Sequence, residues 1–394
     1  MKKGLCLLVS FLVSFQLFAQ IEPKYVKEAC GPYLQNVTDT SFTVIWTTDM
    51  DAVSWVEVAP ADGTNFYNVE RPKYYDLRGL GRKPITKIHK VTVSGLKPDT
   101  KYRYRIMMKG VISQDNRKGI TYTAGYGLDL KSHPTEMKTL AHNYDKLHFS
   151  TVNDMHECDS ALCKLFADAK GKYDFVVFNG DMTSSNDSIS NPVVNYLASA
   201  SRLFASDTPL YIARGNHEYR GNAAIGWYDY LDTPTGKTYY TFKYGKFFFI
   251  VLDSGEDKCD SDVRNLDIMI TEPYVKEEAE WLKKVVASDD FRNSETRIVF
   301  SHIQPDKKSW HGNAMVADYF VPILNKAGID IMLCGHIHQF RYYKPGTTNA
   351  KFPVVCNNMR ERMDTDMDAD KIILTMFSPD GKQTHRLEFR TKQY

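Results

Sequence analysis

The sequence predicts a two-domain protein in which an all-β sandwich is followed by a layered α/β domain. Three observations carry this prediction. The chain has 394 residues, more than one hydrophobic core ordinarily serves. Short alternating strands separated by turn residues fill residues 30 to about 140. From about residue 145 onward, apolar strand patterns alternate with helical patterns.

The N-terminal part has the pattern of a β-sandwich. In 42–47, Phe, Val and Trp alternate with Thr, Ile and Thr. Further short strands are expected at 53–56, 90–93 and 102–106, and Lys97, Pro98 and Asp99 mark a turn. Strands of this length and spacing are typical of two packed antiparallel sheets.

From about residue 145 onward, segments with the period of a strand alternate with segments that have the period of a helix, which indicates two sheets between helices. We expect a hairpin from 239–242 and 247–252. Strands are expected at 147–152, 175–178, 210–213, 297–300, 329–334, 353–356, 371–376 and 383–389. Helices are expected at 159–170, 192–204, 274–286 and 317–327.

Residues 1–19 have the layout of a signal peptide: two lysines, a short apolar run and Ala19 before the expected cleavage. The mature chain is therefore predicted to be exported, to the periplasm or the extracellular space. No later stretch is long and apolar enough for a transmembrane anchor. Cleavage removes Lys2 and Lys3 and no acid, so the formal charge falls from +2 to 0. This balance does not favour a nucleic acid or membrane surface as partner.

The cysteines outside the signal peptide are scattered and contain no CxxC pair, which argues against a structural zinc site. Export permits disulfides, and Cys158 with Cys163 or with Cys259 is a possible pair. Cys334 ends an apolar run, and a buried free thiol is the favoured interpretation there.

Polar residues able to bind metal follow the predicted strands of the second part. Five of the eleven histidines stand directly after apolar strands, which core packing does not predict. Residues two apart on an extended segment point the same way and can chelate one ion, as in Asp154 with His156 or His336 with His338. Glycines at 180, 215 and 335 allow the backbone to approach closely. Mixed oxygen and imidazole ligands suit manganese, iron or zinc. Each residue has a structural alternative, such as a helix cap or a core histidine, but joint coincidence at seven positions is improbable.

The order DxH, GD, GNHE, H, GHxH over residues 147 to about 389 resembles the calcineurin-like metallophosphoesterase superfamily. The stretches GPYLQN (31–36) and HKVTVSGLKPDTKYRYRI (89–106) look like the fibronectin-III-like N-terminal domain of purple-acid-phosphatase-like proteins, with a tyrosine corner at 96–102. The resemblance implies an α/β/β/α metallophosphoesterase domain at 145–394, preceded by the β-sandwich at 20–140.

The resemblance also implies a centre of two metal ions. One ion would be held by Asp154, His156 and His338, a second by Asn216, His302 and His336, and Asp181 would bridge them. His217 would face the substrate as the catalytic residue. Purple acid phosphatases have a metal-binding tyrosine three positions after the bridging aspartate, where this chain has Ser184, and they lack the histidine supplied here by His156. A purple colour is therefore not expected.

These features lead to the hypothesis of a secreted two-metal phosphoesterase that hydrolyses small-molecule phosphate monoesters through a metal-bridging hydroxide. A phosphodiesterase acting on nucleotide or phospholipid-type substrates is the alternative within enzymes. An inactive secreted binding protein is the alternative outside them. The sequence does not identify the substrate, the metals or the oligomeric state.

Some residues are candidates of second rank. Arg214 precedes the GNHE segment and Glu218 is its last residue, and Glu218 is expected to orient His217. His311 stands in a predicted active-site loop and is a candidate substrate contact, whereas His148 lies inside a strand and is interpreted as structural.

The aromatic residues at 227, 228 and 230 either stack on a leaving group or cover the core, with the core favoured. The insert at 67–84 is interpreted as a solvated loop.

Overall fold

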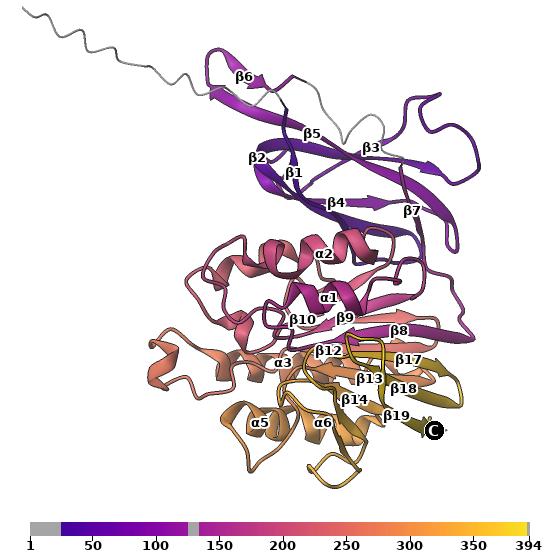
Figure 1. Cartoon of the computed structure of the whole chain (residues 1–394), viewed down its shortest axis with the longest axis vertical. Helices are drawn as coiled ribbons and strands as arrows, with labels where there is room; N and C mark the ends of the chain where they lie inside the picture. The colour runs from indigo at the N-terminus through magenta and orange to yellow at the C-terminus, as the bar shows by residue number, and fades with distance from the viewer. Residues whose placement is uncertain (1–24, 125–133, 392–394) are drawn as a thin grey trace, which may run out of the picture.

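The structure is a computed structural model that describes residues 25–124 and 134–391. The expected signal peptide, residues 1–19, lies outside them. A β module stands on an α/β domain, and the expected fold class is confirmed (Figure 1). Among the described residues, no helix has the length and hydropathy needed to cross a bilayer.

The long strand β2 organises the N-terminal module. Its residues 41–47 pair with β1 on one side and β4 on the other, whereas its residues 52–60 pair with β5 and, in part, with β3. Tyr102 closes the expected corner, since its hydroxyl accepts a hydrogen bond of 2.9 Å from the Lys97 N–H. The strands are β1 (Glu28–Gln35), β2 (Ser41–Pro60), β3 (Lys73–Tyr75), β4 (Thr86–Ser94), β5 (Lys101–Asp115), β6 (Gly119–Tyr122) and β7 (Thr135–Lys138).

The α/β domain contains two six-stranded sheets that face each other. Sheet I has the order β10 (Leu210–Ala213), β9 (Phe175–Asn179), β8 (Lys146–Val152), β17 (Arg362–Asp368), β18 (Lys371–Phe377) and β19 (Gln383–Arg390). Sheet II has the order β11 (Tyr240–Tyr244), β12 (Phe247–Leu252), β13 (Thr296–Ser301), β14 (Ile331–Cys334), β16 (Val354–Cys356) and β15 (Arg341–Tyr343).

Aromatic side chains fill the space between the two sheets. Phe149 and Phe175 of sheet I pack against Phe249 and Phe300 of sheet II, with ring centroids 5.2 to 6.0 Å apart across the interface. Apolar residues on both faces of a central strand are expected when helices cover its other face. The strongly apolar runs of β9 and β12 therefore reflect burial on both sides.

Helices cover the outer face of each sheet, with α1 and α2 on sheet I and α5 and α6 on the far side of sheet II (Figure 1). The helix expected at 192–204 forms as three joined segments, and the one expected at 317–327 begins earlier, at His311. The helical segments are α1 (Asp159–Leu165), η1 (Val193–Leu197), α2 (Ala198–Ala200), η2 (Ser201–Ala205), η3 (His217–Tyr219), η4 (Ala224–Tyr230), η5 (Val263–Asn265), α3 (Thr271–Val286), α4 (Asp289–Arg292), α5 (His311–Met315), η6 (Val316–Phe320) and α6 (Val321–Ala327).

The β module packs directly on the helix layer over sheet I. Cys30, Tyr33 and Ile45 share one apolar cluster with that layer. The Tyr33 hydroxyl donates to the Tyr230 carbonyl at 2.8 Å, and the Ser201 hydroxyl donates to the Pro32 carbonyl at 2.8 Å. The two parts therefore share buried surface.

The cysteines of the described residues are all free, so neither disulfide considered from the sequence forms. Cys334 is fully buried, as expected. Trp227 and Tyr230 are buried too, and the Trp227 ring N–H donates to the Tyr196 hydroxyl at 3.0 Å, so this aromatic segment covers the core. In the 67–84 insert, Arg71 and Arg78 bond within the module.

Candidate metal centre

The predicted metal-binding residues meet at one edge, where strands of both sheets end. Because β8, β9 and β10 are parallel, and β13 and β14 are parallel as well, their carboxyl ends lie together. The residues that follow these ends are Asp154, His156, Asp181 and Asn216 from sheet I and His302, His336 and His338 from sheet II.

Asp154, His156 and His338 form one potential metal-binding group, with one ligand atom of each within 4.8 Å of the others. The His338 Nε2 atom lies 3.2 Å from Asp154 Oδ1 and 3.0 Å from His156 Nε2. Asp154 is fully buried, and its other oxygen accepts hydrogen bonds from the Asn153 amide and the His336 N–H. That leaves Oδ1 as the atom aimed at the two imidazoles.

Asp181, His302 and His336 form an adjoining group. The His302 Nδ1–H donates to the Asn179 carbonyl at 2.8 Å, which turns Nε2 toward Asp181 Oδ2 at 3.0 Å. Asn216 joins this group, because its amide oxygen lies 3.1 Å from His336 Nδ1. Fixing one imidazole nitrogen through a carbonyl is how proteins orient a metal-binding histidine.

Three buried ligand atoms in these groups make no hydrogen bond of good geometry among the described residues, although His302 Nε2 lies 3.0 Å from Asp181 Oδ2. They are Asp154 Oδ1, His302 Nε2 and His336 Nε2. A buried polar atom without a partner costs on the order of 1–3 kcal/mol, so such atoms rarely gather without a ligand. The residues present therefore fit a metal centre.

The electrostatics of the centre favour positive charge. Burial alone would lower the pKa of His302, but the neighbouring Asp181 and Asp154 carboxylates raise it to about 10. Burial alone would likewise raise the pKa of Asp181, yet His302 holds it below its ordinary value. Two buried carboxylates thus require a cation beside them.

The backbone of the centre is strained. Five of the seven predicted ligands have positive φ, with φ of 51° at Asp154, 43° at His156, 53° at Asp181, 73° at His336 and 55° at His338. Positive φ is uncommon outside glycine and asparagine, and it clusters where function requires a particular side-chain direction. At these strand ends, positive φ turns the side chains toward the candidate metal centre.

Glycine permits the close packing at two of these turns. A Cβ atom at Gly215 would lie 2.3 Å from Asp181 Oδ1, and one at Gly180 would lie 2.5 Å from the His302 ring. Any larger residue at either position would displace a predicted ligand.

His217 lies at the border of the centre and lines the cavity above it. Its Nδ1–H donates to the Ser184 carbonyl at 2.7 Å, and its Nε2 accepts from the Arg220 guanidinium at 2.9 Å. Burial is the main cause that lowers the pKa of His217, and Arg220 adds to it. The imidazole is therefore neutral at neutral pH in this arrangement.

The expected role of Glu218 is wrong. Its carboxylate does not contact His217; it accepts hydrogen bonds from the backbone N–H groups of Gly215, Asp181 and Met182 at 2.8 to 2.9 Å. Glu218 therefore fixes the loop that presents Asp181. The local reason is that η3 turns the chain after Asn216, which sends consecutive side chains in different directions.

Arg214 and His311 do not line the cavity beside the metal centre. Arg214 pairs with Asp253 at 2.7 Å and packs on the Tyr219 ring, so it braces the strand ends. His311 lies in the wall of a smaller neighbouring cavity. His148 is structural, as expected, with its Nδ1 atom 2.7 Å from Asp366.

Three residues around the centre were not predicted from the sequence. Asn357 follows β16, and its amide donates to the Asn153 side chain at 3.1 Å, which supports Asp154. The rule that polar residues follow strands would have found Asn357. Arg220 and Lys258 come from loops without any motif, and both line the metal cavity. No sequence signal identifies them.

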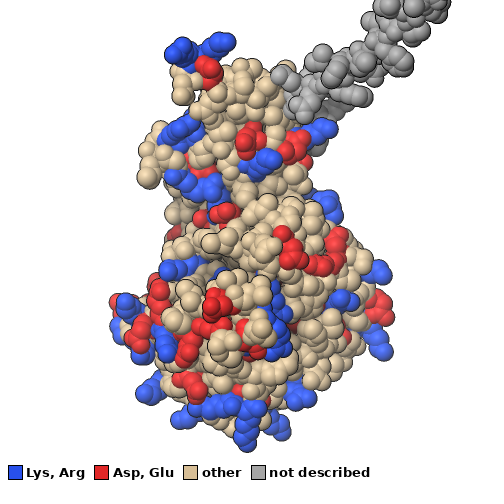
Figure 2. Space-filling view, turned by 90° about the vertical axis from the view of Figure 1, so that its left-hand side faces the viewer, with Lys and Arg blue, Asp and Glu red and all other residues tan. Residues whose placement is uncertain are grey.

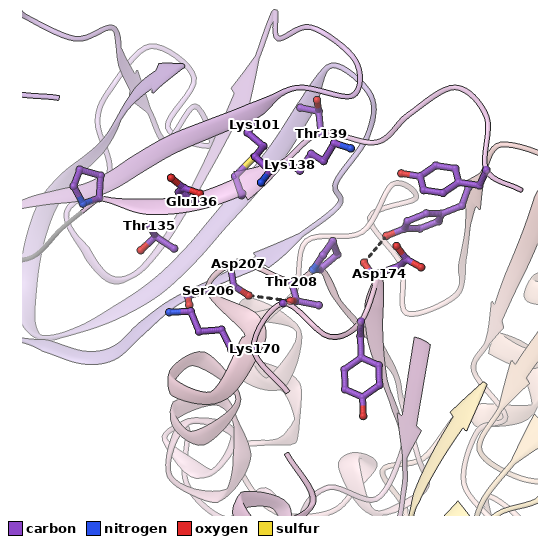
Figure 3. Close-up of a pocket in the computed structure, with 17 residues that line it drawn as sticks. Lys101, Thr135, Glu136, Lys138, Thr139, Lys170, Asp174, Ser206, Asp207 and Thr208 are labelled. Atoms are coloured by element: carbon purple, nitrogen blue, oxygen red, sulfur yellow. Dashed lines mark hydrogen bonds between the residues drawn. The ribbon is translucent and has the colours of Figure 1, made fainter. Parts of the chain in front are cut away.

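The cavity beside the centre has a volume of about 480 Å³. It is lined by Asp181, Asn216, His217, His336 and His338 together with Arg220, Asp257, Lys258 and Trp310. A larger cavity of about 720 Å³ lies between the β module and the start of β9 and β10 (Figure 3). It is at the opposite end of these strands, and none of the predicted metal-binding residues lines it.

Two family models match the chain. Residues 148–340 match the calcineurin-like phosphoesterase family, and residues 31–119 match the N-terminal domain of purple acid phosphatases. The second match covers most of the β module, and the first covers the strand ends that carry the cluster.

Individual relatives agree with these matches. The chain is 20% identical over 326 residues to purple acid phosphatase 21 of Arabidopsis thaliana, which covers 76% of this chain and 62% of the relative. The structure resembles the purple acid phosphatase PPD1 of yellow lupin (Lupinus luteus), with a TM-score of 0.65, 16% identity and coverage of 94% of this chain and 75% of that one. It also resembles PhoD, with a TM-score of 0.59, 12% identity and coverage of 91% and 92%. At these identities the structural likeness concerns the fold. From these matches, the chain carries a calcineurin-like phosphoesterase domain, preceded by a purple acid phosphatase N-terminal domain.

Proposed function

We propose that the protein is an exported, metal-dependent hydrolase of small-molecule phosphate monoesters. One observation supports this most strongly. Three overlapping groups of side chains able to bind metal, one of them formed by His156, Asp181 and His217, include unpaired ligand atoms and open on a cavity that Arg220 also lines. In this proposal residues 1–19 are a signal peptide, residues 20–140 form one domain and residues 145–394 form the other.

The proposed ligands are those expected from the sequence. Asp154, His156 and His338 would hold one ion, Asn216, His302 and His336 the other, and Asp181 would contribute to both. Their oxygen and imidazole atoms suit manganese, iron or zinc. When bound, the ions supply Lewis acidity toward phosphoryl oxygens and a water nucleophile of lowered pKa.

His217 is the proposed catalytic residue. The Ser184 carbonyl accepts from its Nδ1–H, so Nε2, which accepts from Arg220 in this structure, is the nitrogen left to exchange a proton once the guanidinium turns to the phosphoryl group. A dianionic ester near the ring would raise the pKa of His217, and Nε2 would then carry the proton that the leaving alkoxide needs. General acid catalysis of this kind contributes typically 10²- to 10⁴-fold.

Arg220 is the proposed phosphoryl-binding residue. Its guanidinium is oriented by Glu256 and Asp257, with contacts of 2.8 and 2.9 Å, and it reaches His217 on its other side. A guanidinium fixed in this way offers donors to a phosphoryl oxygen in a definite geometry.

Hydrolysis of nitrophenyl phosphates tests the proposal. Residues 20–394 would be stripped of metal and reloaded with manganese, zinc or iron. We expect release of nitrophenol by the wild type and losses of at least about 100-fold in Asp181→Asn and His217→Ala. Asp145→Asn, at an exposed aspartate just before β8, is the matched control and should keep full activity.

A wild type no faster than the Asp181→Asn and His217→Ala variants with every metal would refute the proposed hydrolysis. The ratio of rates on mono- and bis-nitrophenyl phosphate separates the monoesterase from the alternative phosphodiesterase. A metal-free protein with tight ligand binding would instead support the inactive binding protein.

A further inference from the structure

A second cavity adjoins the metal cavity. The second has a volume of about 350 Å³, and its walls include Asp257, Lys258 and Trp310, which also line the metal cavity. Asp257 and Lys258 lie in the loop after β12, and Trp310 lies in the loop after β13. A substrate with its phosphate at the metal centre therefore has room for a leaving group that passes Trp310.

Trp310 stands at this junction with an unusual exposure for its type. It is 61% exposed, although tryptophan is on average highly buried. The Trp310 and His336 rings lie nearly perpendicular to each other, with centroids 5.4 Å apart and an interplanar angle of 84°. The ring thus adjoins a predicted metal ligand and presents aromatic surface to the cavity.

The charges around the junction are paired with one another. Lys258 contacts Asp257 at 2.5 Å, Arg220 contacts Glu256 and Asp257, and Arg264 contacts Asp262 at 2.6 Å. Figure 2 shows acidic and basic side chains next to one another on this side of the molecule, without a continuous field of either sign. A chain of further phosphates would need uncompensated cations. An uncharged leaving group needs none.

We propose that this junction is the leaving-group subsite, and that Trp310 stacks on an aromatic ring of the substrate, as in a nucleoside monophosphate or an aryl phosphate. The proposal rests on the proposed phosphatase function and adds the class of leaving group. The second cavity receives the ring and the polar groups attached to it, and Lys258, whose Nζ atom lies 6.0 Å from the centre of the Trp310 ring, borders the same space.

The test compares Trp310→Ala with Trp310→Phe on three substrates: adenosine 5′-monophosphate, phenyl phosphate and glycerol 1-phosphate. Stacking of one aromatic ring on Trp310 predicts a loss of roughly tenfold in kcat/KM for the first two in Trp310→Ala, and less than about twofold for glycerol phosphate. Trp310→Phe should restore most of the loss. Leu266→Ala is the matched control, since this exposed residue of the neighbouring loop lines neither cavity.

Equal losses on all three substrates, or no loss on any, would overturn the subsite. Binding of adenosine 5′-monophosphate to the metal-loaded protein, measured by calorimetry, separates this outcome from failure of the proposed function. A wild type that hydrolyses nothing but binds the nucleotide about tenfold more tightly than Trp310→Ala would refute the hydrolysis and support the subsite. Equal binding by the two proteins would overturn the subsite whether or not turnover occurs.

Discussion

Gly180 controls the position of a predicted metal ligand through packing alone. Its φ is +87°, and an added Cβ would lie 2.5 Å from the His302 ring. Gly180→Ala should therefore lower the free energy of unfolding by about 2–4 kcal/mol and reduce bound metal, since the ring must move away from Asn179 and Asp181. Urea denaturation and elemental analysis measure the two effects.

Gly171→Ala is the matched control for that substitution. Gly171 also has positive φ, +67°, but no atom lies within 4 Å of the added Cβ. Gly171→Ala should lower the free energy of unfolding by only about 1 kcal/mol, because alanine is strained at positive φ, and should leave the metal content unchanged. If the two variants lose equal stability and equal metal, packing against His302 is not what Gly180 provides.

The sequence predicted which residues reach the site, but not how each side chain is directed. The seven candidate metal ligands were predictable because each follows an apolar strand, and the structure brings all seven together. The direction of a side chain within a turn was not predictable, which is why Glu218 was assigned to His217 instead of the Asp181 backbone. Arg220 was not predicted as a site residue because its position depends on Glu256, which lies in a different loop.

Among the elements, β17 was not expected at all, although it is a central strand of sheet I between β8 and β18. Its sequence RMDTDMD alternates with period two, and Met363 and Met367 face the core between the sheets. The aspartates on the other face obscured the pattern, because buried aspartate is rare unless it is paired. Asp364 is paired, at 3.0 Å from Arg362 and 3.1 Å from the Tyr173 hydroxyl.

The packing of β4 against β2 predicts a dependence of stability on pH. His89 on β4 is buried between the Thr48 hydroxyl, at 3.0 Å, and the Trp46 ring, at 5.1 Å. Burial lowers the pKa of His89 to about 3. The unfolded chain takes up this proton near pH 6.5, so the stability is full above that pH and falls as the pH drops toward 3.

His89→Gln isolates this dependence, since glutamine keeps a hydrogen-bonding group and does not titrate. Between pH 7 and pH 5 the wild type should lose about 2 kcal/mol more unfolding free energy than the variant. Urea titrations followed by tryptophan fluorescence give both curves. Parallel curves across this range would show that His89 is not buried as a neutral ring.

At the scale of the whole molecule, the β module and the α/β domain unfold together in this account, because Tyr33 lies in a core that belongs to both. The protein should unfold in a single transition, and Tyr33→Ala should lower the free energy of unfolding by about 3–5 kcal/mol. Tyr122→Ala, on the exposed β6 hairpin, should stay within about 0.5 kcal/mol of the wild type. Two separate transitions, with only one of them shifted by Tyr33→Ala, would mean that the interface does not couple the domains.

The overall architecture was predictable, since strand and helix periods distinguish the β module from the layered domain. The contact between them was not, because Cys30, Tyr33 and Ile45 have the same pattern as any other core strand residue. The junction between the two cavities was equally invisible. It forms only where the loops after β12 and β13 approach each other in the folded chain.

The central claim is that one edge of the α/β domain binds two metal ions with Asn216 as a ligand and His217 beside them. The number of bound metal ions per chain, determined by elemental analysis after reloading and desalting, tests it most directly. We predict about two ions in the wild type and in His217→Ala, and fewer in Asn216→Ala. A wild type without bound metal, or equal metal loss in Asn216→Ala and His217→Ala, would contradict the account.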